Sequence, residues 1–237
     1  MTQQPNTCHI TLWTKCLATR ITLLCALCLA VCHAVPALAA TSDKARQLVR
    51  QAANAAVHKD SRQSSALLFK ARSEAEAAAD YDQLFWVYTN LGINQAELLN
   101  YADALQHFTK AYQIATEHLD ERRVLSIRNN IAGLYMMNHE QNKALAEYIK
   151  IYADIKGSTD SVFTGGCALN IATLLTDKHQ YAQARPYMEQ AELLLGRYAE
   201  NRAALVTLRT DYLLGTGNTE GAYRLVADAQ TKYPALQ

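Results

Sequence analysis

The sequence is poor in the two residues that most often interrupt regular structure, since its 237 residues include only 9 Gly and 4 Pro. Sheet proteins with many tight turns need both, so this scarcity argues against an all-β fold. Neither acidic nor basic residues are in large excess. The net charge of +1 gives no electrostatic reason to expect a nucleic acid partner. Half of the residues are apolar, which is too many for a disordered chain.

The first forty residues have the features of an export signal. Two basic residues, Lys15 and Arg20, precede an uncharged apolar run over residues 21–31. Small residues at 37–39 then match the A-x-A pattern of a cleavage site. We predict a signal peptide over residues 1–39, cleaved after its last residue, and a mature protein in the periplasm or outside the cell.

Two other interpretations of this segment stay open. Residues 21–40 contain no charged residue and are long enough to span a bilayer, as an uncleaved anchor would. Residues 29–32 resemble a bacterial lipobox ending at Cys32, although Val31 stands where that motif has a smaller residue. Either would hold the protein at a membrane through its N-terminus.

Cysteine is scarce beyond this segment, because Cys167 is the only one of six that follows residue 32. A single cysteine cannot form an internal disulfide, so packing must stabilise the exported part. Cys167 lies in an apolar stretch, which favours a buried structural thiol over a reactive one.

The chain contains a repeat with a period of forty residues. Identical residues recur at that spacing at Asn90, Asn130 and Asn170, and again at Ala104, Ala144 and Ala184. Apolar residues within each unit fall three, four and seven apart, which indicates two amphipathic helices separated by polar turns. We expect the three asparagine amides to bond backbone groups of the neighbouring helix, because an unpaired buried amide is costly.

This pattern resembles the tetratricopeptide repeat, whose consensus runs W-x2-L-G-x2-Y, then A-x3-F, then P. The residues expected at its structural positions are Leu91, Gly92, Ala104, Phe108, Ile131, Ala144, Tyr148, Ile171, Ala184 and Met188. The commonest repeat of that family has about 34 residues, so here each helix should be about one turn longer or each connection looser.

The resemblance implies an all-α fold, a right-handed superhelical solenoid of four to five antiparallel helix pairs. A degenerate helix pair is expected over residues 43–84, before the better repeats. The repeats are expected over 85–124, 125–164, 165–202 and 203–237.

Motifs for catalysis, metals and cofactors are missing. The five histidines after residue 39 have no partner at the spacing of a zinc site, and residues 139–143 fail H-E-x-x-H at the last position. A phosphate loop, a serine elbow and a calcium loop are absent as well. We therefore predict that the protein is not an enzyme and uses no metal or cofactor.

In tetratricopeptide repeats the first helix of each unit lines a concave groove, so the resemblance implies one here. The groove residues that it implies are Trp86, Thr89, Ile93, Glu97, Asn129, Met136, Met137, Thr173 and Asp177. The set contains no Lys or Arg, unlike the family's clamp for C-terminal carboxylates. Trp86 and the two methionines would suit an amphipathic helix or apolar peptide, unless the methionines pack between repeats instead.

Together these observations favour an exported, non-catalytic scaffold whose groove binds a protein or peptide of apolar or basic character. Two alternatives stay open. The chain could be a sensory or regulatory module of an envelope signalling complex. It could instead be a structural component of the envelope that self-associates through an apolar last helix containing Leu225, Val226 and Ala229.

Overall fold

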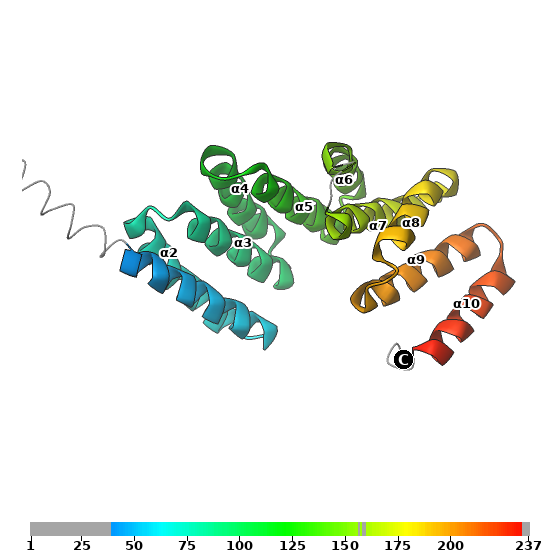
Figure 1. Cartoon of the computed structure of the whole chain (residues 1–237), viewed down its shortest axis with the longest axis horizontal. Helices are drawn as coiled ribbons and strands as arrows, with labels where there is room; N and C mark the ends of the chain where they lie inside the picture. Colours follow the sequence, from blue (N-terminus) through cyan, green and yellow to red (C-terminus); the bar gives the residue numbers. More distant parts are fainter. Residues whose placement is uncertain (1–38, 156, 158–159, 234–237) are drawn as a thin grey trace, which may run out of the picture. The chain divides into compact units, whose positions relative to one another are not determined.

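The computed structural model describes residues 39–155, 157 and 160–233, so the predicted signal peptide lies outside the described residues except for Ala39. Regular structure in this part of the chain is entirely helical (Figure 1). After a helix over residues 39–57, the elements are α2 (Ser61–Ala78), α3 (Tyr81–Glu97), α4 (Tyr101–His118), α5 (Glu121–Met137), α6 (Gln141–Ile155), α7 (Ser161–Asp177), α8 (Tyr181–Leu195), η1 (Ala199–Asn201), α9 (Arg202–Gly215) and α10 (Thr219–Lys232). None of the described helices is long and apolar enough to cross a membrane.

The chain divides into two compact units between Asn90 and Leu91, within α3. In the first unit, the helix over residues 39–57 is tied to α2 by an ion pair between Lys44 and Glu74. Small and apolar residues of this unit are fully buried, namely Ala45, Ala52, Leu68, Ala71 and Ala75.

In the second unit each helix packs on its neighbours along the chain. Helix α5 contacts α4 and α6, and α7 contacts α6, α8 and α9. The predicted packing of helices in antiparallel pairs is confirmed. The three repeated alanines, at 104, 144 and 184, have no exposed surface. Among the expected structural positions, Ile131 is partly buried and the other nine are buried.

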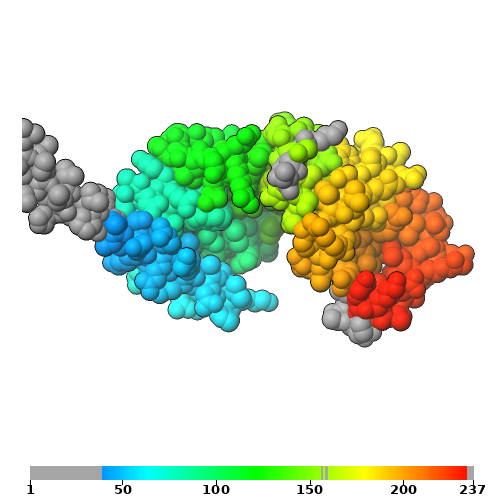
Figure 2. Space-filling view, in the orientation of Figure 1, coloured from blue at the N-terminus to red at the C-terminus, as the bar shows by residue number. Residues whose placement is uncertain are grey.

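The last helix, α10, packs on α9, and their red and orange atoms adjoin in Figure 2. Of the residues considered for self-association, Ala229 is buried, whereas Leu225 and Val226 are partly buried. Of these three apolar side chains, only Leu225 and Val226 are therefore partly accessible to another molecule.

The turn between the two helices of each pair has the same backbone geometry every time. Its left-handed residues follow the repeat, with φ between +57° and +83°, at Lys59, Leu99, His139, His179 and Gly217. In the turn after α3, the Leu99 N–H bonds the carbonyl of Ala96 and the Asn100 N–H bonds that of Gln95. This is a Schellman motif, and the same bonds recur at the other four turns.

Helices α3, α5 and α7 each contain 17 residues and begin four residues before 85, 125 and 165, the expected starts of the repeats. An aspartate precedes each of them, and its carboxylate accepts a hydrogen bond from the backbone N–H three residues on. The pairs are Asp80 with Gln83, Asp120 with Arg123 and Asp160 with Phe163. These N-caps recur every forty residues and extend the first helix of each pair by one turn.

Candidate functional site

A groove with a volume of about 370 Å³ lies in the second unit, between the C-terminal part of α3 and helix α5. Helices α4 and α6 contribute one aromatic residue each. The lining consists of Ile93, Ala96, Glu97, Phe108, Asn129, Asn130, Gly133, Leu134, Met137 and Tyr148.

The aromatic residues of this groove are held rigidly by packing. Phe108 is 3% exposed, and a Cβ atom on Gly92 would lie only 2.4 Å from its ring, so the ring fills the space that a side chain would need. Tyr148 is 2% exposed, and burial raises the pKa of its phenol. At Gly133 the space stays open, because a Cβ atom there would be 3.5 Å from the Tyr148 hydroxyl.

The side chains at the mouth of the groove are accessible to a partner. Ile93 is 37% exposed and Met137 is 45% exposed. Glu97 is also exposed, and it is the only charged residue in the lining. Among the described residues no cation lies within ion-pair distance of its carboxylate. The groove therefore combines an apolar interior with one unneutralised negative charge.

Four of the nine groove residues expected from the sequence meet in this groove, namely Ile93, Glu97, Asn129 and Met137. Two others, Thr173 and Asp177, lie on α7 outside its lining. The Thr173 hydroxyl donates a hydrogen bond to the Leu169 carbonyl, at 2.9 Å.

The two methionines, whose role the sequence left open, have different surroundings. Met137 lines the groove, whereas Met136 packs against the buried cluster that includes Ala132 and Ile171. The remaining expected residues, Trp86 and Thr89, belong to the first unit. Thr89 is 3% exposed, and the Trp86 ring stands edge-on to Phe85 with 5.2 Å between centroids.

No protein-family model matches the chain, and no curated protein matches it. Solved structures do match. Aspartyl phosphate phosphatase F from Bacillus subtilis has a TM-score of 0.69 and 18% identity, over 82% of this chain and 52% of that one. This chain thus spans about half the length of that protein.

Two further structures have the same architecture. A kinesin light chain from Podosopora anserina, with nearly identical TPR-like repeats, matches 81% of this chain and 97% of its own, with a TM-score of 0.63 and 13% identity. The Rap conjugation gene regulator of plasmid pLS20, solved in complex with the Phr* peptide, has a TM-score of 0.54 and 13% identity, over 83% of this chain and 64% of that one. The chain has a tetratricopeptide-repeat-like fold.

Within this tetratricopeptide-repeat-like chain, the groove also contains residues that sequence reasoning did not place there, Asn130 and Leu134 among them. The sequence suggested a purely structural amide at position 130. The Asn90 amide bonds a backbone group, as expected, but the expectation of a neighbouring helix is wrong there, because its Nδ2 donates to the carbonyl of Trp86 on its own helix, at 2.7 Å. Because Trp86 is four residues earlier, the bond stays within one turn of helix.

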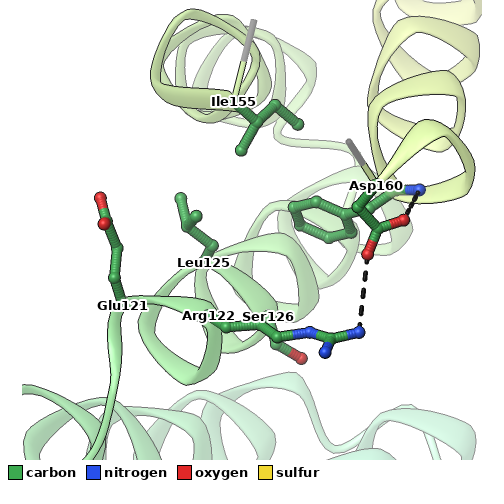
Figure 3. Close-up of a pocket in the computed structure, with 7 residues that line it drawn as sticks. Glu121, Arg122, Leu125, Ser126, Ile155 and Asp160 are labelled. Atoms are coloured by element: carbon green, nitrogen blue, oxygen red, sulfur yellow. Dashed lines mark hydrogen bonds and ion pairs between the residues drawn. The ribbon is translucent and has the colours of Figure 1, made fainter. Parts of the chain in front are cut away.

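A second cavity of the tetratricopeptide-repeat-like chain, about 660 Å³ in volume, was not predicted (Figure 3). It is lined by Glu121, Arg122, Leu125, Ser126, Ile155, Asp160 and Phe163. An ion pair of 3.6 Å joins Arg122 to Asp160 at its edge. The cavity lies where α6, at 15 residues, is shorter than α4, at 18, and where five residues rather than two lead to the next helix.

The described residues include one cysteine, and it is buried. Cys167 is fully buried, and burial raises the pKa of its thiol to about 12, which keeps it protonated at neutral pH. Its environment agrees with the predicted structural role. Among the described residues no group of three or more His, Cys, Asp or Glu side chains could hold a metal ion.

Proposed function

We propose that this protein is an exported, non-catalytic scaffold that binds a peptide segment of a partner protein in the groove between α3 and α5. The observation that carries this proposal is the exposure of Ile93 and Met137 above two buried aromatic rings. Exposed apolar side chains around a preformed concavity are typical of binding sites. The similarity to a regulator solved in complex with a peptide supports it.

The proposed mode of binding needs no catalytic group. Apolar side chains of the partner would displace water from the groove, and Met137 can adapt its rotamer to different shapes because its side chain is unbranched. The groove is preformed, so little ordering would be required on binding. Affinity would come from a few buried anchors in the partner.

The experiment that tests the groove selects ligands from a phage-displayed library of 12-residue peptides on the full-length protein. The affinities of the selected peptides are then measured for the wild type and for Met137→Ser. For Met137→Ser we expect about a tenfold loss, because the apolar contact with the methionine side chain is removed without adding a charge.

The matched control is Leu193→Ser, which alters another exposed apolar residue, on α8 and outside the groove. Both variants should keep the helical circular dichroism signal of the wild type, and the control should keep wild-type affinity. Equal affinity of the selected peptides for Met137→Ser and the wild type would show that the groove is not the site.

Export is the second part of the proposal, and it is supported by the basic, apolar and small-residue segments before residue 40. N-terminal sequencing of the protein from the periplasm or the medium should find Ala40 as the first residue. A full-length chain recovered only from the cytoplasm would contradict it.

A further inference from the structure

The negative charge of Glu97 in the groove restricts which partners can bind there. Glu97 is exposed at the mouth, and no described cation is within ion-pair distance of it. Two cations of α5 and α6 already have acidic partners of their own. Arg128 pairs with Glu147 at 2.6 Å and with Asp154 at 2.8 Å, and Lys143 pairs with Glu140.

The helix ends add negative potential at the same place. Glu97 is the last residue of α3 and Met137 is the last residue of α5, and both line the groove. The C-terminus of a helix carries a partial negative charge, which favours cations placed near it. Because α4 and α6 begin four residues after these ends, their N-termini offset part of that charge, and the Glu97 carboxylate is the full negative charge at this end of the groove.

A partner that covers this end must compensate the charge. An apolar segment alone would remove water from Glu97 and supply nothing in exchange, which is unfavourable for an ionised group. An acidic segment or a C-terminal carboxylate would add repulsion. A Lys or Arg side chain would replace the lost water with a charge-assisted hydrogen bond.

We propose that the groove selects peptide segments in which an apolar side chain is flanked by Lys or Arg. The apolar side chain enters between Ile93 and Met137, over Phe108 and Tyr148, and the cation lies against Glu97 and the ends of α3 and α5. This inference rests on the proposed function and specifies the class of partner.

The test repeats the selection of 12-residue peptides on the full-length wild type and on Glu97→Lys, and compares the two sequence pools. The wild-type pool should be enriched in Lys and Arg next to apolar residues, and the Glu97→Lys pool should lose that enrichment and gain Asp and Glu. For individual basic peptides, we expect Glu97→Gln to weaken binding two- to fivefold, the range of an exposed ion pair. Glu97→Lys should weaken it at least tenfold.

Glu117→Lys is the matched control, because Glu117 is an exposed glutamate at the end of α4, outside the groove lining, and the substitution makes the same change in net charge. Its affinity should stay within twofold of the wild type. If it loses as much affinity as Glu97→Lys, the effect is one of overall charge and the inference is overturned.

The failure of this inference differs from the failure of the proposed function. Selected peptides that depend on Met137 but show no basic enrichment, and that bind Glu97→Lys normally, would overturn the charge preference and leave the groove as the binding site. Peptides that bind Met137→Ser as well as the wild type would overturn both.

Discussion

Gly92 and Gly133 are neighbours of the same groove, yet a methyl group would have opposite consequences at the two positions. A Cβ atom at Gly92 would lie 2.4 Å from two atoms of the Phe108 ring, closer than any real contact. Phe108 is buried and cannot move aside without disturbing the core. We expect Gly92→Ala to lower the free energy of unfolding by about 1–2 kcal/mol, measured by urea denaturation.

The control for this prediction is Gly133→Ala, whose Cβ atom would meet only the Tyr148 hydroxyl at an ordinary distance of 3.5 Å. Alanine is the better helix former, so this variant should be neutral or more stable by up to about 1 kcal/mol. If Gly92→Ala proved as stable as Gly133→Ala, the packing assigned to Phe108 would be wrong.

At the scale of elements, the recurring turns contain a strain that substitution can relieve. Leu99 has φ of +63°, a left-handed conformation that costs a non-glycine residue about 1–2 kcal/mol. Its side chain is 67% exposed, so little apolar burial would be lost on truncation. After allowance for the greater unfolded-state entropy of glycine, we expect Leu99→Gly to raise the free energy of unfolding by about 1 kcal/mol.

Leu98→Gly provides the comparison, because Leu98 is also exposed, at 54%, but is not among the residues with positive φ. The same chemical denaturation should show this second variant to be less stable than the wild type. A destabilised Leu99→Gly would mean that the leucine side chain contributes more than its backbone strain costs.

At the scale of the whole molecule, the forty-residue period predicts which deletions leave a folded protein. Removing residues 101–140 deletes α4 and α5 and joins Asn100 to Gln141, which takes the place in the repeat that Tyr101 has in the intact chain. Stability in repeat proteins is approximately a sum over neighbouring units. We expect the shortened protein to remain helical by circular dichroism, with a free energy of unfolding lower by about 2–6 kcal/mol.

Removing residues 101–142 instead would take two further residues from the start of α6. This turns the buried face that contains Ala144, Tyr148 and Ile151 by about 200° relative to the preceding turn. That protein should unfold or aggregate. Equal stability of the two deletion proteins would contradict the shared register of the repeats.

The all-α fold and the pairing of helices could be predicted because both depend on local patterns. Apolar residues three and four apart determine the buried face of each helix, and the identical spacing of Ala104, Ala144 and Ala184 requires the same packing in each pair. The first turn of each leading helix could also be predicted from the sequence. Asp80, Asp120 and Asp160 recur at the repeat spacing, and aspartate is a preferred N-cap, so these residues mark the start of each leading helix.

The sequence by itself determined the helical class and the forty-residue register. It also determined that the expected groove residues include no Lys or Arg. Each of these is a property of spacing or composition. Only the tertiary structure decided that Met137 is accessible while Met136 packs in the core, and that Asn130 and Leu134 belong to the groove. The physical reason is that the groove is formed by side chains from four helices. Which neighbours meet there depends on how those helices pack, and no single helix contains that information.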